Sequence, residues 1–257
     1  MKKIFFAITF LFCISKANSQ VIISLIFGDK LNSPNLEFGL VGGVNFSDIS
    51  NLEDSEVASN FNLGFYFDYR IIKNTEWLLN TGVLVISSVG AESLPVYSLG
   101  DVNVDNTFTG GFVNREINYF YVPLMMKYKF KNNIYAKGGG QAGLLGKAND
   151  IFVNYYNESR IVLENNIRDK IHVVDAGLTA GLGYRIDKGY GMNVELQYYY
   201  GLVPLLKGDT SPNQFNRSLY LSVGIPIGKG ASKKNKEAKE AAEKASAEQN
   251  RATPTQP

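Results

Sequence analysis

The feature that most constrains the fold of this chain is an alternation of apolar and polar residues. In FNLGFYFDYRI, residues 61–71, every second residue is apolar or aromatic: Phe61, Leu63, Phe65, Phe67, Tyr69 and Ile71. Successive side chains of a β-strand point to opposite faces of a sheet, so this segment has one apolar face and one polar face. The pattern predicts a strand whose two faces meet different environments.

The same alternation recurs along most of the chain and predicts eight strands. The third segment, EWLLNTGVLVISS, is apolar on both faces in its second half and shows the pattern least clearly. The eight predicted strands are residues 37–46, 61–72, 76–88, 115–130, 133–145, 171–186, 190–202 and 216–228.

The connections between these strands alternate between long and short. The long ones are residues 47–60, 89–114, 146–170 and 203–215, and the short ones are 73–75, 131–132 and 187–189. This order is typical of an up-and-down barrel in the outer membrane, which has tight turns on the periplasmic side and long loops outside. We therefore predict an all-β fold, an eight-stranded antiparallel transmembrane β-barrel over residues 20–228. Strands can span hydrocarbon only as a closed barrel, so the apolar face, including Phe61 and Phe65, is expected to contact outer-membrane lipid.

Both ends of the chain differ from the barrel in composition. Residues 1–19 have a basic start, an apolar run and a small-residue cleavage site at Ala17-Asn18-Ser19, which predicts a cleaved signal peptide and export to the outer membrane. The only cysteine, Cys13, lies in that segment, so no disulfide is expected after export. Residues 229–257 are rich in Ala, Lys and Glu, and they predict a disordered or weakly helical periplasmic tail with a polar surface. Contact of this tail with the cell wall or another envelope protein is an alternative.

The charge distribution argues against a nucleic-acid partner. Three of the 26 Lys and Arg residues lie before residue 20 and seven lie after residue 228, which leaves 16 in the barrel region. The same region holds 20 of the 24 Asp and Glu residues. A slightly acidic body lacks the basic footprint that nucleic-acid binding requires.

Charged residues of both signs fall on the face that is predicted to point into the barrel. An eight-stranded barrel is only wide enough to be filled by its own side chains, so these charges are expected to pair across the lumen and close it. A narrow conducting or binding path is the alternative. The predicted lumen charge network comprises Asp68, Arg70, Lys127, Lys137, Asp175, Arg185 and Glu195.

The sequence offers little for catalysis or for a cofactor. His172 is the single histidine, and no cysteine or acidic cluster accompanies it at metal-ligand spacing. The run KGGGQAG is not followed by the Lys-Ser/Thr pair of a phosphate loop. We therefore expect no enzymatic activity, no metal and no cofactor.

Recognition is expected in the long outer loops, because a rigid scaffold presents such loops to partners. The loop of residues 146–170 carries three aromatic residues, Phe152, Tyr155 and Tyr156, which are the predicted contact residues.

Five segments together resemble the PorT-like outer-membrane β-barrel proteins of some Gram-negative bacteria. They are FGLVGGVNFSD (38–48), YFYVPLMMKYKF (119–130), YAKGGGQAGLLG (135–146), DAGLTAGLGYRI (175–186) and LQYYYGL (196–202). The resemblance implies an eight-stranded outer-membrane barrel, and the namesake of the family is an accessory of type IX secretion. The C-terminus departs from the family, because Ile227-Gly228 and a polar tail stand where such barrels end on an aromatic residue.

Two functional hypotheses follow. The first is a non-enzymatic outer-membrane protein that acts through its outer loops or as an accessory of a secretion assembly. The second is a soluble, secreted, lipocalin-like barrel that binds a small ligand, which would require an apolar cavity.

Overall fold

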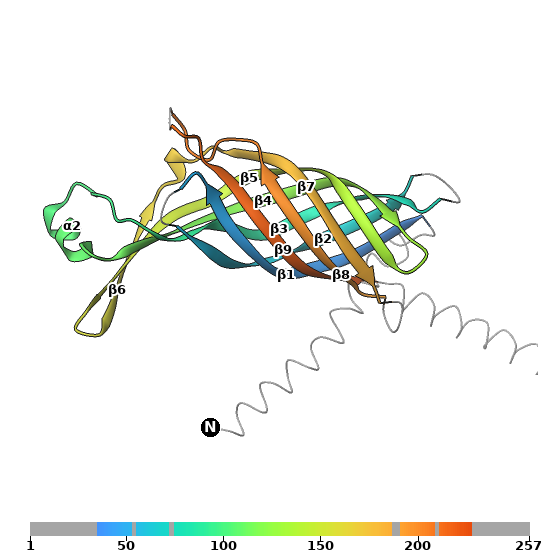
Figure 1. Ribbon diagram of the computed structural model, residues 1–257, viewed down its shortest axis with the longest axis horizontal. Coiled ribbons are helices and arrows are strands. Elements are labelled where there is room, and N and C mark those ends of the chain that lie inside the picture. Colours follow the sequence, from blue (N-terminus) through green and yellow to red (C-terminus); the bar gives the residue numbers. More distant parts are fainter. Residues whose placement is uncertain (1–34, 53–54, 72–74, 187–190, 209–210, 228–257) are drawn as a thin grey trace, which may run out of the picture. The chain divides into compact units, whose positions relative to one another are not determined.

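The structure, a computed structural model, describes residues 35–52, 55–71, 75–186, 191–208 and 211–227. The predicted signal peptide and C-terminal tail lie outside these residues. Residues 39–225 form one compact unit (Figure 1). Just outside that unit, the backbone N–H of Ile227 donates a hydrogen bond to the carbonyl of Phe38 at 2.9 Å.

Eight strands close into an antiparallel ring, which confirms the predicted fold class. In order around the ring they are β1 (Leu36–Ser50), β2 (Glu56–Arg70), β3 (Trp77–Leu94), β4 (Phe112–Lys129), β5 (Ile134–Tyr156), β7 (Val174–Arg185), β8 (Asn193–Gly201) and β9 (Phe215–Pro226). A ninth strand, β6 (Ser159–Asn166), pairs with the outer part of β5 only. The structure also contains a short helix, α2 (Val102–Phe108), and a 3₁₀ turn, η1 (Arg168–Lys170).

The connections differ from prediction at three places, one of which is residues 89–114, where β3 continues to Leu94, β4 begins at Phe112 and α2 lies between them. β1 and β2 continue toward each other until only residues 51–55 separate them, so the first outer connection is short. Residues 146–170, predicted as a loop, contain a hairpin in which the end of β5 pairs with β6. Figure 1 shows α2 and this hairpin at the same end of the unit, its left side. No helix among the described residues has the length and apolar character needed to cross a membrane.

A β-bulge explains why the third segment alternates poorly. Leu63 on β2 pairs with Ile86 on β3, whereas Gly64 pairs with Leu84, so Val85 is an extra residue on β3. A bulge of this kind places two consecutive residues on one face of the sheet. Val85 and Ile86 are accordingly both exposed.

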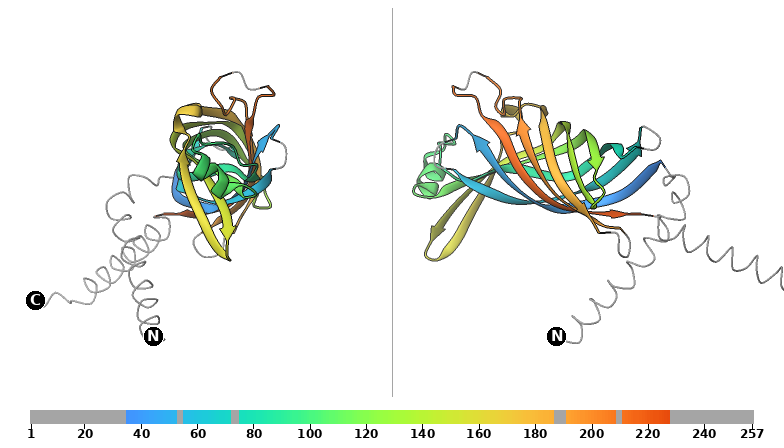
Figure 2. Two further views of the ribbon diagram at one scale, coloured as in Figure 1. Left: turned by 90° about the vertical axis from the view of Figure 1, so that its left-hand side faces the viewer. Right: turned by 45° about the vertical axis from the view of Figure 1, so that its right-hand side comes forward.

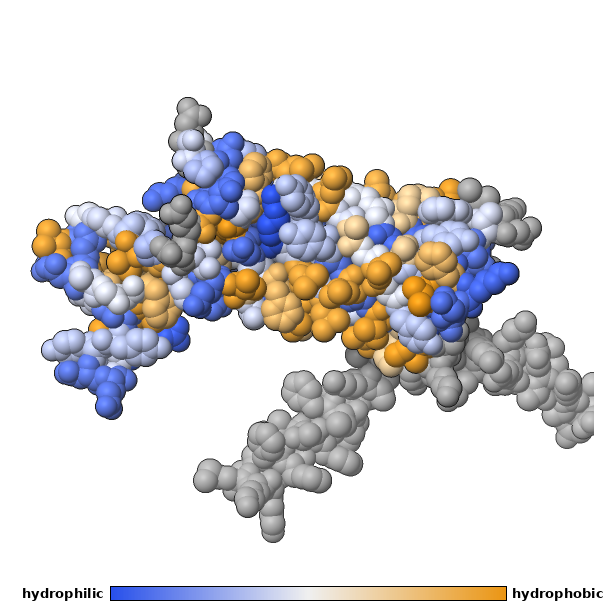
Figure 3. Space-filling view, in the orientation of Figure 1, coloured by the Kyte–Doolittle hydropathy of each residue, from blue (hydrophilic) through white to orange (hydrophobic). Residues whose placement is uncertain are grey.

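The apolar face of the strands points outward and the polar face points inward, as predicted. On β2, Phe61 and Phe65 are 54% and 39% exposed, whereas Asn62 and Asp68 are buried. Figure 3 shows a broad band of apolar residues over the middle of the ring. Burying such a band in hydrocarbon is favourable, whereas leaving it in water would expose a large apolar surface.

Close packing inside the ring predicts a measurable cost for one added methyl group. A Cβ atom at Gly183 would lie 2.2 Å from Cζ of Tyr135, its partner on the neighbouring strand, whereas one at Gly138 would meet nothing closer than 3.8 Å. We expect Gly183→Ala to lower the free energy of unfolding by about 1–3 kcal/mol because the Tyr135 ring must move. Gly138→Ala is the matched control, and urea unfolding in lipid vesicles is the measurement. Equal stability of the two variants would contradict this packing.

Candidate functional site

Two buried ion pairs lie in the lumen, near the end of the ring that carries the short turns. Nζ of Lys127 on β4 lies 2.6 Å from Oδ2 of Asp68 on β2, and Nζ of Lys137 on β5 lies 2.8 Å from Oε1 of Glu195 on β8. The Tyr135 side chain lies between the pairs, because its hydroxyl donates to Glu195 at 3.1 Å and its ring centroid is 3.9 Å from Nζ of Lys127. Each carboxylate therefore has a cation, and buried charges with such partners are tolerated.

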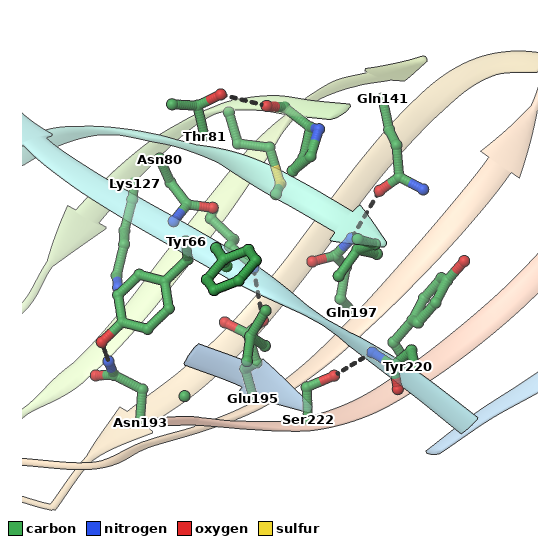
Figure 4. Close-up of a pocket in the computed structure, with 18 residues that line it drawn as sticks. Tyr66, Asn80, Thr81, Lys127, Gln141, Asn193, Glu195, Gln197, Tyr220 and Ser222 are labelled. Atoms are coloured by element: carbon green, nitrogen blue, oxygen red, sulfur yellow. Dashed lines mark hydrogen bonds and ion pairs between the residues drawn. The ribbon is translucent and has the colours of Figure 1, made fainter. Parts of the chain in front are cut away.

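A small cavity lined by both polar and apolar side chains lies beside these ion pairs (Figure 4). Its volume is about 40 Å³, and amide, hydroxyl and charged side chains form much of its lining. Three buried polar atoms in its wall lack a hydrogen-bond partner: Oδ1 of Asn62, Nε2 of Gln141 and Oδ1 of Asn193. Because a cavity needs only about 10–15 Å³ to hold a water molecule, this one has room for a few waters that would satisfy those atoms.

The other three members of the predicted charge network lie apart from these ion pairs. Asp175 is buried, but it accepts hydrogen bonds from Tyr121 (2.6 Å) and Asn216 (2.9 Å) and forms no ion pair with a described residue. Arg70 donates to the backbone carbonyl of Thr75, near the start of β3. The guanidinium of Arg185 lies beside Gly191, next to the start of β8. The structure thus brings together four of the seven predicted residues.

Tyrosine fills much of the remaining lumen, which the sequence prediction did not include. Six inward tyrosines are at most 8% exposed: Tyr66, Tyr119, Tyr121, Tyr135, Tyr199 and Tyr220. All of their hydroxyl groups except that of Tyr199 form a hydrogen bond, as Tyr66 does in accepting from Asn193 at 3.2 Å. The alternation of the sequence could have identified some of these tyrosines. In YFYVPL and QYYYGL every second residue falls on the inner face, and those residues include Tyr119, Tyr121 and Tyr199.

The lumen ion pairs predict a strong asymmetry between inward and outward substitutions. Glu195→Ala leaves Lys137 without its carboxylate where water is largely excluded, so we expect a loss of about 3–5 kcal/mol in unfolding free energy. Asp175→Ala removes the acceptor for Tyr121 and Asn216, and it should destabilise the barrel by a smaller amount, about 1–3 kcal/mol. Phe65→Leu on the lipid face is the control and should change stability little. Urea unfolding in lipid vesicles measures all three variants.

The same packing predicts that the lumen does not conduct. Charges of both signs pair with one another and form no single-sign ring of the kind that selects ions. Purified protein in planar bilayers should give no steady channel. Ion-selective channels in the wild type, with Asp175→Ala changing selectivity and leaving stability intact, would contradict a closed lumen.

The outer hairpin forms a second candidate site, at the end of the unit that carries α2. Its two-residue turn, Asn157-Glu158, has positive φ at both positions (48° and 62°), as a tight hairpin requires. Of the three predicted contact residues, Tyr155 and Tyr156 are 62% and 68% exposed. Phe152 is 1% exposed and packs inside the outer extension, by which we mean α2 and the β5–β6 hairpin. It therefore does not belong to the exposed surface of the hairpin.

An apolar cluster holds the extension together. Phe152 on β5 contacts Phe108 of α2 and Tyr97, with ring centroids 5.7 and 4.9 Å apart. Nδ2 of Asn154 donates to the Thr107 carbonyl at 2.7 Å, which ties α2 to β5. Figure 2 (left) views the unit from this end, with α2 and the β5–β6 hairpin in front.

A third ion pair, which the sequence analysis did not predict, lies at the base of the outer extension. Arg115 on β4 makes a two-pronged contact with the buried carboxylate of Asp150 on β5, both distances being 2.8 Å. The Tyr97 hydroxyl donates to the same carboxylate at 2.9 Å and accepts from Asn165 on β6. Burial and then the hydrogen bond to Asp150 raise the pKa of Tyr97 to about 12.

This pKa predicts how the extension responds to alkali. Because the folded pKa of Tyr97 lies above its ordinary value of 10.0, its stabilising effect is complete below pH 10 and is lost as the pH rises toward 12. NMR of ¹³Cζ-labelled tyrosine, with Tyr97→Phe to assign the signal, should show this titration. Asp150→Asn should move the titration to lower pH. A Tyr97 signal that titrates at or below pH 10 would contradict the prediction.

No group of three or more His, Cys, Asp or Glu residues in the described ranges is placed to hold a metal ion.

A family match agrees with this architecture. Residues 27–207 match a family described as "Outer membrane protein beta-barrel domain". Similar solved structures include the attachment invasion locus protein Ail of Yersinia pestis (12% identity, 76% of this chain and 99% of that chain covered, TM-score 0.38). OprG from Pseudomonas aeruginosa (14%, 75% and 93%, 0.38) and Neisserial surface protein A (13%, 74% and 96%, 0.34) are also similar. No curated protein gives a significant match. Of these comparisons, the family match is the one that assigns this chain to a family.

Proposed function

This chain belongs to the outer-membrane protein β-barrel domain family, and from that premise we propose that it is a non-enzymatic recognition protein of the outer membrane. Its binding element is the free edge of β6, which adds an extended segment of a partner polypeptide as a further strand. The soluble, lipocalin-like alternative does not fit this chain, because the ring exposes an apolar outer face and its lumen cavity, at about 40 Å³, is small.

The geometry of the hairpin identifies the edge groups. A two-residue turn makes Tyr156 and Ser159 a hydrogen-bonded pair, and such pairs alternate with non-bonded ones along an antiparallel ladder. The backbone groups of Arg160, Val162 and Glu164 therefore point away from β5. β6 has no other strand beside it, so these groups form an open edge among the described residues.

The side chains near this edge suit recognition. Tyr155 and Tyr156 at the tip are exposed aromatics, a residue type that is enriched at protein interfaces. Val162 is 48% exposed and adds an apolar contact, while Arg160 and Glu164 supply charges of opposite sign. An open edge supplies affinity through main-chain hydrogen bonds, and pockets or side chains beside it supply specificity.

A second candidate function is a role as a secretion accessory of the PorT-like kind. The five sequence segments that resemble that family support it, and the predicted partner surface is the polar tail of residues 229–257. In this alternative the envelope partner lies on the periplasmic side, whereas strand addition at β6 takes place outside the cell.

A proline substitution at the edge separates the two functions. Val162→Pro removes one outward N–H without removing a β5–β6 ladder bond, so we expect it to abolish strand addition while the barrel still folds. Val162→Thr keeps the N–H and is the matched control. A photo-crosslinker at Tyr155 in intact cells reports partner contact, and hydrogen exchange of the Arg160, Val162 and Glu164 amides reports strand addition.

The expected result is slower exchange of those three amides with the partner bound, and loss of crosslinking in Val162→Pro alone. If crosslinking survives Val162→Pro, strand addition at β6 is wrong. If deletion of residues 229–257 abolishes every phenotype while the edge variants have none, the secretion-accessory function is favoured instead.

A further inference from the structure

A pocket of about 180 Å³ lies between α2 and β5 in the outer extension. Its floor consists of the buried rings of Phe108 and Phe152. Val96, Leu99 and Val104 line its sides and are only half-buried, so the fold leaves part of their apolar surface uncovered. This pocket is separate from the small cavity of the lumen.

Local hydrogen bonds fix the walls of this pocket. The Asp101 side chain accepts from the backbone N–H groups of Asn103 (2.9 Å) and Val104 (3.3 Å) and so caps the start of α2. The bond from Asn154 to Thr107 ties the far end of α2 to β5. The pocket is therefore a preformed concavity, which lowers the ordering cost of binding.

The volume and lining select the size of an apolar occupant. Apolar cavities of roughly 150 Å³ accommodate a benzene ring. A pocket of about 180 Å³ floored by two aromatic rings thus fits one ring or a branched aliphatic group of similar size. A lipid chain or a bulky fused ring system would exceed it.

A carboxylate at the rim selects the charge of the occupant. Asp105 lines the pocket, and its two oxygens accept from Oγ of Ser98 (2.5 Å) and from the backbone N–H of Leu99 (2.8 Å). These hydrogen bonds, that of Ser98 first, lower the pKa of Asp105, so the rim carries a negative charge at neutral pH. No ion pair between Asp105 and a described cation accompanies it.

We propose that this pocket, lined by Phe108, Phe152, Leu99 and Val104 with Asp105 at its rim, binds a single apolar ring that carries a short cationic amine. The ring lies against the two phenylalanines and the amine contacts the Asp105 carboxylate. A free arylalkylamine and an aromatic side chain next to a lysine in a peptide share this chemistry. The proposal adds a second site to the proposed function and does not use the β6 edge.

Ligand-observed ¹⁹F NMR on the full-length protein in lipid nanodiscs tests the proposal. The probes are 4-fluorophenethylamine, its carboxylate counterpart 3-(4-fluorophenyl)propionate, and the capped dipeptide 4-fluorophenylalanyl-lysine amide. Empty nanodiscs correct for partition of the probes into lipid. We expect the amine to bind about fivefold more tightly than the carboxylate, which is the scale of one exposed charge contact.

Three variants locate the binding. Val104→Trp should fill the pocket and reduce the signal of every probe to that of empty nanodiscs, whereas Val102→Trp on the outer side of α2, where Val102 is 73% exposed, should leave binding unchanged. Asp105→Asn should bring the amine and the carboxylate to equal affinity, and its amide oxygen still accepts the Leu99 N–H. Tighter binding of the dipeptide than of the free amine assigns the natural occupant to a peptide, and the reverse assigns it to a small molecule.

Two results would overturn the proposal. Probe signals that match those of empty nanodiscs would show that the pocket binds no ring, and equal binding of amine and carboxylate to the wild type would remove the role of Asp105. Neither result bears on Val162→Pro, so failure of this site and failure of strand addition at β6 are distinguishable.

Discussion

The closure of the backbone hydrogen-bond ring is the constraint on which the rest of this structure depends. In hydrocarbon an unpaired N–H or C=O group costs several kcal/mol, so each spanning strand needs a neighbour on both sides. Eight antiparallel strands meet that condition, because β9 returns to pair with β1. Alternation in the sequence follows directly, since one face of each strand contacts lipid and the other contacts a narrow lumen.

The narrowness of that lumen decides its chemistry. With eight strands there is space only for side chains, and each charge that enters must find a partner there. Lys127 and Lys137 each reach over one intervening strand to Asp68 and Glu195, and buried tyrosines lie beside these pairs. At about 40 Å³, the cavity beside these pairs has room for a few waters but not for a ligand of lipocalin size.

The sequence predicted the ring well because alternation is a local signal, and it predicted the outer extension poorly because several of its determinants are not local. Alternation does continue past residue 145, with Ala148, Asp150 and Phe152 all buried, but the turn at Asn157-Glu158 has no glycine to mark it. The pairing of Asp150 with Arg115 depends on the register of β4 and β5, and this register cannot be read from the amino-acid composition. Similarly, no single residue of VLVIS identifies Val85 as the extra residue of a bulge.

The charge network was predicted in part. Four of its members form ion pairs, whereas Asp175 accepts hydrogen bonds from Tyr121 and Asn216. The sequence pattern shows which side chains face the lumen, but which of them meet there depends also on strand register.

The place where β5 changes its partner shows where the constraint of the ring ends. Up to Leu144 its pairing is with β4 and β7, and from Asn149 onward β6 replaces β7. Among the strands that the structure describes, none lies beside the second edge of β6. Hydrocarbon would not tolerate such an edge, but water can satisfy its backbone groups. Beyond this point strand edges and half-covered apolar side chains are permitted, and these are the groups with which a protein binds a partner. The two parts of β5 thus differ in role: the inner part closes the barrel, and the outer part carries the β5–β6 hairpin that we propose as a recognition surface.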